Sequence, residues 1–204
     1  MGYLTRNKVF HKGKVDDWEV SADLFFLGEI EMQAQFAACS YGEIAERVEQ
    51  GNKDVGLFAF CHMFLVFSGN ISKLLFCNGS SSSSERERRR RIRNRLGVSR
   101  ESSLADRASR NYMEHFDERM ERYLKPKGDR CITIPRLIVD EEPEVITLDD
   151  GRSFPPKFLR LFNVSTFELI LYDQRVALNP IYEEVCIVQE RAKALIESLP
   201  DARG

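Results

Sequence analysis

The sequence predicts a mainly α-helical fold: an up-and-down helical bundle with a small β-hairpin or meander inserted before the last helix. Three observations indicate this fold. Apolar residues recur at helical spacing through most of residues 16–124, β-branched residues and turn signals concentrate in 130–175, and helical spacing returns in 180–199. The chain has 204 residues, of which 43% are hydrophobic. This length suits one sizeable core, so we expect a single domain over 1–204.

The first predicted helix runs from Trp18 to Glu49 and would be ~48 Å long at 1.5 Å per residue. Asp16 or Asp17 can cap its start, and Gly51-Asn52 ends it. One face carries apolar residues three or four positions apart throughout. These are Val20, Leu24, Leu27, Ile30, Ala34, Ala37, Tyr41, Ile44 and Val48.

The second predicted helix begins after Asp54 as its cap, runs to about Phe76, and is stopped by Asn78-Gly79. It is apolar nearly all round, so we expect it in the middle of the bundle, with His62 as a buried, hydrogen-bonded core histidine. Its most apolar stretch, Val55–Phe67, is shorter than the ~20 residues that a membrane span needs. We therefore expect a cytoplasmic protein without a membrane segment.

A serine run and an arginine run follow the second helix. The composition of Ser80–Ser84 is that of a flexible linker, and Glu85–Arg95 contains seven arginines. Arginine on every face of a short helix is not expected in a core, so this segment is interpreted as a mobile, solvated arm. It would contact RNA phosphates, bind an acidic protein, or simply form a solvated face. The residues assigned to RNA binding are Arg88, Arg89, Arg90, Arg91 and Arg93.

A third helix is predicted for Leu104–Leu124, capped by Ser102 or Ser103. Pro126 and Gly128 end it. Its apolar stripe consists of Leu104, Ala108, Tyr112, Phe116, Met120 and Tyr123.

The β insertion begins with Cys131–Val139, which is rich in β-branched residues. Val145–Leu148 leads into Asp150-Gly151, a hairpin turn signal. Phe158–Phe162 and Thr166–Tyr172 form a second predicted strand pair around a turn.

The last helix is predicted to start with Asn179-Pro180 as cap and first-turn residues, and Pro200 closes it. Its apolar stripe again has helical spacing, through Ile181, Val185, Val188, Ala192, Leu195 and Leu199.

Motifs for cofactors and metals are missing from the sequence. Its five cysteines have no CxxC or CxH spacing, so we expect reduced thiols and no zinc. GxxxxGK[ST], GxGxxG and GxSxG do not occur. The acidic residues between Asp140 and Asp150 are interpreted as solvated turns, and His11 as a surface residue. We expect no cofactor and no metal.

The remaining histidine, His115, lies in a polar part of the third helix, within Arg110-Asn111-Tyr112-Met113-Glu114-His115. This segment resembles the R-x4-6-H motif of the HEPN superfamily, in its frequent form of Arg, a polar residue, three variable residues and His. Phe116-Asp117-Glu118-Arg119 is similar to an extension of the motif in uncharacterised bacterial HEPN-like proteins. The resemblance implies a helical bundle with the motif near the start of a late helix.

The resemblance also implies metal-independent cleavage of RNA. In this proposed nuclease, His115 transfers a proton as acid or base and Arg110 holds the phosphate. Asn111 orients the histidine or the RNA backbone. Positions 110 and 115 are ~140° apart on an ideal helix, so the two side chains do not lie on the same face. In the family, a homodimer brings two copies of the motif together in a composite site. The resemblance further implies a biological role as the toxin of a toxin–antitoxin or phage-defence system, with a cognate antitoxin protein as partner.

The same residues allow structural roles. Arg110 has potential salt-bridge partners four positions away, in Asp106 and Glu114, and His115 lies at the edge of the apolar stripe. The alternative to a nuclease is then a non-catalytic HEPN-like bundle that binds RNA or protein. A structural helical adaptor is the third hypothesis.

Overall fold

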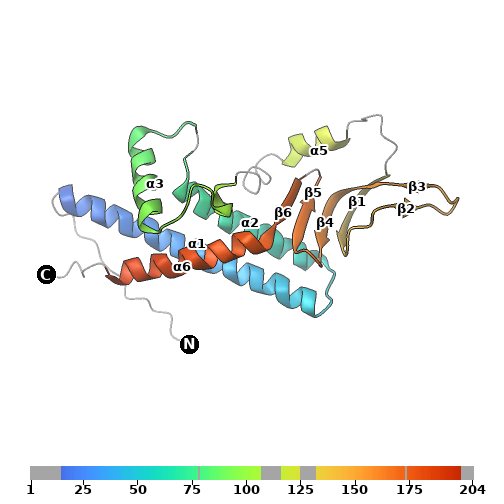
Figure 1. Cartoon of the computed structure of the whole chain (residues 1–204), viewed down its shortest axis with the longest axis horizontal. Helices are drawn as coiled ribbons and strands as arrows, with labels where there is room; N and C mark the ends of the chain where they lie inside the picture. Colours follow the sequence, from blue (N-terminus) through green and yellow to red (C-terminus); the bar gives the residue numbers. More distant parts are fainter. Residues whose placement is uncertain (1–14, 78, 107–115, 125–131, 173, 199–204) are drawn as a thin grey trace.

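A computed structural model describes residues 15–77, 79–106, 116–124, 132–172 and 174–198. It is mainly helical, with a small sheet before the last helix, as the sequence predicts. Three long helices lie side by side and the sheet covers one end of them (Figure 1). The long helices are α1 (Val15–Glu49), α2 (Val55–Leu75) and α6 (Leu178–Ser198).

Helix α1 packs against both α2 and α6, and its predicted apolar stripe is confirmed where side chains are described. Leu27, Ile30 and Ile44 are fully buried in the main hydrophobic core, together with Ala34 and Ala37. Gly51 ends the helix region with φ +68°, a conformation that glycine adopts without a steric penalty.

Helix α2 has the predicted cap but not the predicted position. The Asp54 carboxylate accepts the backbone N–H of Leu57 at 3.2 Å. Leu57, Phe64 and Ile71 are buried, whereas His62 is exposed and Met63 is 42% exposed. The expectations of a central helix and of a core histidine are therefore wrong, because the described neighbours of α2 pack on one side of it and leave His62 and Met63 exposed.

Helix α2 is, among the described helices, the one long and apolar enough to cross a membrane by length and composition. The core helix of a soluble protein meets the same criteria, and α2 buries its inner face against other elements of this chain.

Helix α3 (Ser83–Arg95) is docked on the bundle rather than extended from it as an arm. Ile92 and Leu96 are fully buried in the main core. The serines before it are not a flexible linker: Ser81 is buried and Ser82 is the N-cap. The solvated-arm expectation is wrong because one side of α3 carries core residues.

The predicted helix Leu104–Leu124 is not continuous. Ser102 caps a single 3₁₀ turn, η1 (Ser103–Ala105), and Asp106 is extended with ψ 120°. The Ser102 hydroxyl donates to Glu184, and the Ser103 hydroxyl donates to the Pro180 carbonyl oxygen at 3.0 Å. These bonds to α6 hold the segment in a turn. Helix α5 (Phe116–Leu124) forms the later part of the prediction.

The sheet differs from a simple meander. Its strand order is β1-β4-β5-β6, with β1 parallel to β4 and the other pairs antiparallel. A short hairpin, β2–β3, projects from the sheet (Figure 1), and Gly151 in its turn has φ +83°. The strand bounds are β1 Ile132–Val139, β2 Ile146–Thr147, β3 Ser153–Phe154, β4 Pro156–Asn163, β5 Glu168–Leu171 and β6 Gln174–Ala177.

Helix α6 begins at Leu178, directly after β6, so Asn179 lies in its first turn and not at its cap. The Asn179 amide oxygen accepts a hydrogen bond from the Tyr41 hydroxyl at 2.7 Å. The Tyr41 ring stacks on Tyr182 with centroids 3.9 Å apart. Val185 and Val188 of the predicted stripe are buried, and these contacts join α6 to α1.

Candidate nucleic-acid interface

The three motif residues, Arg110, Asn111 and His115, lie outside the described residues, so their predicted roles stay predictions. Asp106 is described on one side of them and Phe116 on the other. The alternative pairing of Asp106 with Arg110 assumed a helix through both residues. The backbone of Asp106 is extended, so the helix that this i,i+4 ion pair needs is absent at Asp106.

The described part of the candidate site is α3, which is capped at its start and bonded to α6 at its end. At its start, the Ser82 hydroxyl accepts the Glu85 N–H at 3.3 Å, and Glu85 accepts the Ser82 N–H at 2.8 Å. This capping box satisfies two backbone donors. At its end, Arg191 of α6 donates to the carbonyl oxygens of Leu96 at 2.7 Å and Gly97 at 3.0 Å. The position of α3 on the bundle is thus fixed by named contacts.

The inner side of α3 is attached to α1 through a buried carboxylate. Arg91 donates from Nε and Nη2 to the two oxygens of Asp23, at 2.9 and 2.8 Å. Arg95 donates to the same carboxylate at 3.0 Å. The Asp23 side chain is only 2% exposed. Both guanidinium groups offset the cost of removing this charge from water.

Arg93 also faces inward. It is 9% exposed, its Nη1 donates to the Leu75 carbonyl oxygen at 3.4 Å, and its guanidinium lies 5.5 Å from the Phe76 ring centroid. Arg91 and Arg93, two of the predicted RNA-binding residues, therefore have internal partners. Their observed contacts hold α3 in place.

Of the other predicted arginines, Arg90 lies on the outer side of α3, one turn after Arg86, whereas Arg88 and Arg89 contact neighbouring segments. Arg86 and Arg90 are exposed, while Arg88 and Arg89 are half-buried. The Arg86 Nε donates to the Ser81 carbonyl oxygen at 2.8 Å, and Arg89 donates to the Ser81 hydroxyl at 2.6 Å. The Arg88 guanidinium lies 4.0 Å from the Phe26 ring centroid. Arg86 and Arg89 are thus bonded to Ser81, and Arg88 is packed on α1.

The charge of this region is strongly positive. Three carboxylates, those of Glu85, Glu87 and Asp23, lie on or against a helix with seven arginines, which leaves a net charge of +4. Hydrogen bonds from Ser82 lower the pKa of Glu85, and the Arg89 and Arg88 charges act in the same direction. The outer side of α3 can therefore attract and hydrogen-bond an anion such as a phosphate diester.

Asp23 is the functional partner that sequence reasoning missed. Its position is one helical turn before Leu27 and two turns before Ile30, on the face that becomes the core of α1. A carboxylate on a core face needs a buried cationic partner, and the nearby arginine run supplies one. This signal was present in the sequence, although it does not identify which arginine pairs with Asp23.

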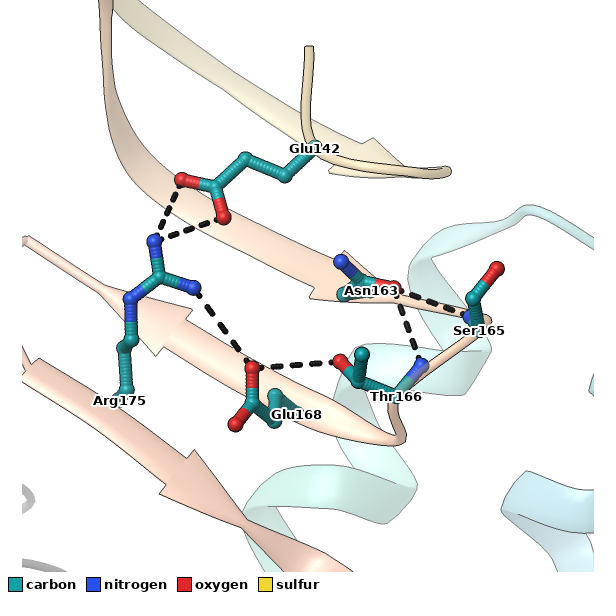
Figure 2. A network of polar contacts seen from close by, with 6 residues as sticks. All are labelled: Glu142, Asn163, Ser165, Thr166, Glu168 and Arg175. Carbon is teal, nitrogen blue, oxygen red and sulfur yellow. Dashed lines mark hydrogen bonds and ion pairs between the residues drawn. The ribbon is translucent and has the colours of Figure 1, made fainter. Parts of the chain in front are cut away.

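The acidic segment of the β insertion is paired with basic residues. Arg175 of β6 donates to Glu142 at 2.7 Å and lies 3.6 Å from Glu168 of β5 (Figure 2). The Asn163 side chain accepts the N–H groups of Ser165 and Thr166 in the β4–β5 turn (Figure 2). These bonds stabilise the turn and the outer strands.

Two more of these acidic residues have basic partners. Asp140 binds Lys53 at 3.0 Å, and Asp150 binds Arg152 at 2.6 Å. These partners lower the pKa of both carboxyls. Within the described ranges, no group of three or more His, Cys, Asp or Glu side chains is arranged to hold a metal ion.

Comparison of the chain with protein-family models, with curated proteins and with solved structures finds no match.

Proposed function

We propose that this chain binds RNA through the outer side of α3 and cleaves it, without a metal ion, at a HEPN-type site formed by Arg110, Asn111 and His115. The observation that supports binding is the docked arginine helix α3, which together with Asp23 carries a net charge of +4. The support for cleavage is the sequence motif and its resemblance to the HEPN superfamily.

An anchored arginine helix suits a polyanion because some of its side chains are already restrained. The side chains of Arg88 and Arg89 are already restrained by Phe26 and Ser81, so less conformational entropy is lost when they bind a phosphate. Arg91 and Arg93 serve to hold the helix. The proposed phosphate contacts are accordingly Arg86, Arg88, Arg89 and Arg90.

The proposed cleavage uses the ribose itself as nucleophile. The 2′-hydroxyl attacks the adjacent phosphorus, the bond to the leaving 5′-oxygen breaks, and a 2′,3′-cyclic phosphate remains. His115 takes the hydroxyl proton or protonates the leaving oxygen, and Arg110 stabilises the charge on the phosphate oxygens. Each copy supplies one set of these groups, so the proposed site requires a homodimer.

Binding is tested by fluorescence anisotropy with a labelled single-stranded RNA at several salt concentrations. Each lost phosphate contact reduces the slope of log affinity against log salt by about 0.7. We expect the double variant Arg86→Gln/Arg90→Gln to lower the slope by roughly 1 to 1.5. Arg152→Gln/Arg160→Gln removes two exposed arginines of the β insertion and is the charge-matched control. An equal effect of the two double variants would refute the assignment to α3.

Cleavage is tested separately, with the same RNA in excess EDTA. Arg110→Ala and His115→Ala, made singly, should each abolish the cyclic-phosphate product and leave the helical circular-dichroism signal unchanged. Full activity in both variants would eliminate the proposed nuclease.

A non-catalytic RNA-binding bundle is the second candidate, because the charge of α3 supports binding whether or not cleavage occurs. It predicts normal salt-dependent binding by the wild-type chain and no product at any enzyme concentration. If the chain is a nuclease, a toxin or phage-defence role follows as a proposal, and growth inhibition on expression would depend on His115.

A further inference from the structure

Helix α3 contains no aromatic residue, but rings from the neighbouring helices lie against its arginines. The Arg88 guanidinium lies 4.0 Å from the centroid of the Phe26 ring of α1. The Arg93 guanidinium lies 5.5 Å from the ring centroid of Phe76, at the end of α2. Arginine and aromatic side chains are therefore neighbours in the fold although the sequence keeps them apart. Binding sites for single-stranded nucleic acids combine these two kinds of side chain.

Phe25, next to Phe26 in α1, is the exposed ring of this region. It is 61% exposed, compared with 44% for Phe36 further along the same helix. Helix α3 lies beside the first half of α1 (Figure 1), where Asp23 and Phe26 contact its arginines. Consecutive side chains on a helix point about 100° apart, so Phe25 lies next to Phe26 around α1, on the side away from Asp23. On a helix about 10–12 Å wide, this angle separates the two side chains by roughly 8 Å.

Small residues flank the Phe25 ring along the helix. Ala22 precedes Phe25 by three positions and Phe26 by four, so it lies beside both rings. Gly28 follows Phe25 by three positions, and a Cβ there would meet no atom within 4 Å apart from the backbone of its own helix. Neither residue has a side chain that could cover the ring. A flat group of a ligand can therefore reach Phe25 across Ala22, close to the Arg88 guanidinium.

The charges on this surface differ between α3 and α1. Glu29 of α1 follows Phe26 by three positions and Phe25 by four, and its carboxylate accepts the Gln33 side-chain N–H at 2.7 Å. A carboxylate repels a phosphate but can accept a hydrogen bond from an amino group of a base. The α3 arginines, in contrast, attract phosphates. A strand bound here would place its backbone towards α3 and its bases towards this face of α1.

We infer that the RNA is single-stranded where it crosses α1, and that one of its bases stacks on the Phe25 ring while its phosphates contact the arginines of α3. Binding of RNA by α3 is part of the proposed function, on which this inference therefore rests. The substrate class that it adds is an unpaired RNA segment of any sequence, since every base has a face that can stack.

A duplex would not use this surface in the same way. Bases in a duplex are stacked on one another, so a protein recognises an RNA helix mostly through its shape, its phosphates and its 2′-hydroxyl groups. Such contacts would involve the arginines and leave Phe25 in water. In a single strand, an unstacked base can cover the ring, and stacking then adds to the affinity that the arginines supply. Loss of the ring should therefore weaken binding of a single strand but not of a duplex.

The test compares variants of the full chain by fluorescence anisotropy, with a labelled single-stranded RNA and with a duplex of the same sequence. We expect Phe25→Ala to weaken binding of the single strand by roughly 5- to 150-fold, the range for one stacked base. The salt dependence of this affinity should stay that of the wild type, because no phosphate contact is lost. Binding of the duplex should be unchanged. Phe25→Tyr, which keeps a ring, should bind the single strand as the wild type does.

Phe36→Ala is the matched control. Phe36 is an exposed phenylalanine on the same side of α1, and it lies roughly 16 Å further along the helix, beyond the residues that contact α3. This variant should bind both RNAs normally. Unchanged duplex binding by Phe25→Ala also shows that the variant is folded. Equal losses in Phe25→Ala and Phe36→Ala, equal losses for the single strand and the duplex, or normal binding by Phe25→Ala would overturn the inference.

The same measurements separate a failure of this inference from a failure of the proposed function. If single-strand binding by the wild type depends on Arg86 and Arg90 but not on Phe25, α3 binds RNA and the stacked base is refuted. If the wild-type chain binds neither RNA, the proposed function and the stacked base are refuted together.

Discussion

Arg91 of α3 donates two hydrogen bonds to Asp23 of α1 across 68 residues of sequence, with Nε and Nη2 at 2.9 and 2.8 Å from the two carboxylate oxygens. Arg95 adds a third bond at 3.0 Å. Two-pronged contacts of this kind fix direction as well as distance. The orientation of the whole arginine helix on the bundle therefore depends on one buried carboxylate.

Replacing this carboxylate should weaken the fold. We expect Asp23→Asn to lower the free energy of unfolding by about 1.5–3 kcal/mol, the range for hydrogen bonds to charged groups, because Arg91 and Arg95 are partly exposed and regain water. Urea unfolding followed by circular dichroism measures the change. Glu87→Gln breaks the exposed pair with Arg90 (2.9 Å) and should cost less than about 0.5 kcal/mol. Equal losses in the two variants would contradict the structural role of Asp23.

Gly97 after α3 offers a test of the C-terminal anchor. Its φ is +60°, and a Cβ there would lie 2.9 Å from the Arg191 Nη1. Gly97→Ala should destabilise the protein by about 1–2 kcal/mol from the backbone conformation alone, and further by displacing Arg191. In an Arg191→Ala background the second part is absent. A double-mutant cycle by urea unfolding should therefore give a smaller cost of Gly97→Ala in that background.

The two sides of α2 should respond differently to truncation. His62 is exposed, so His62→Ala is expected to change the free energy of unfolding by less than about 0.5 kcal/mol. Phe64, two residues later, is fully buried, and Phe64→Ala should cost about 3–5 kcal/mol. Thermal and urea unfolding of both variants compare the two sides directly. A large loss in His62→Ala would restore the core-histidine interpretation.

The capping box gives a pH dependence with a definite sign. Hydrogen bonds from Ser82 lower the pKa of Glu85 in the folded state, so the ionised form favours folding. This contribution is present above the unfolded pKa of about 4.3 and is lost as the pH falls through the lower folded value. Glu85→Gln should therefore be less stable than wild type at neutral pH, and the difference should shrink in acid. A difference independent of pH would contradict this account.

Local signals in the sequence predict much of the helical fold. The Asp54 cap, the Gly51 stop and the apolar spacing of α1 are all properties of neighbouring residues, and the structure places these helix ends within a few positions. The β2–β3 hairpin is likewise set by its turn. Each of these features depends on interactions over a few residues.

The features that differ depend on partners far away in the sequence. The arginine segment becomes a docked helix because Asp23 is its partner, and Leu104 enters a 3₁₀ turn because Ser102 bonds to Glu184, 82 residues later. The parallel β1–β4 pairing is also nonlocal. Within the candidate site, Arg90 is exposed on α3 and Arg88 and Arg89 are half-buried against other segments, while the placement of the motif residues remains a sequence prediction.

The packing of α1 between α2 and α6 has a consequence for biosynthesis. Helix α1 is translated well before α6, which follows all the other described elements in the chain. Until α6 has been made, the side of α1 that receives Ile181, Val185 and Val188 faces water. Exposed apolar surface on a nascent chain attracts chaperones and promotes aggregation. Slow translation or early termination before Leu178 would therefore leave an aggregation-prone product, whatever the stability of the finished protein.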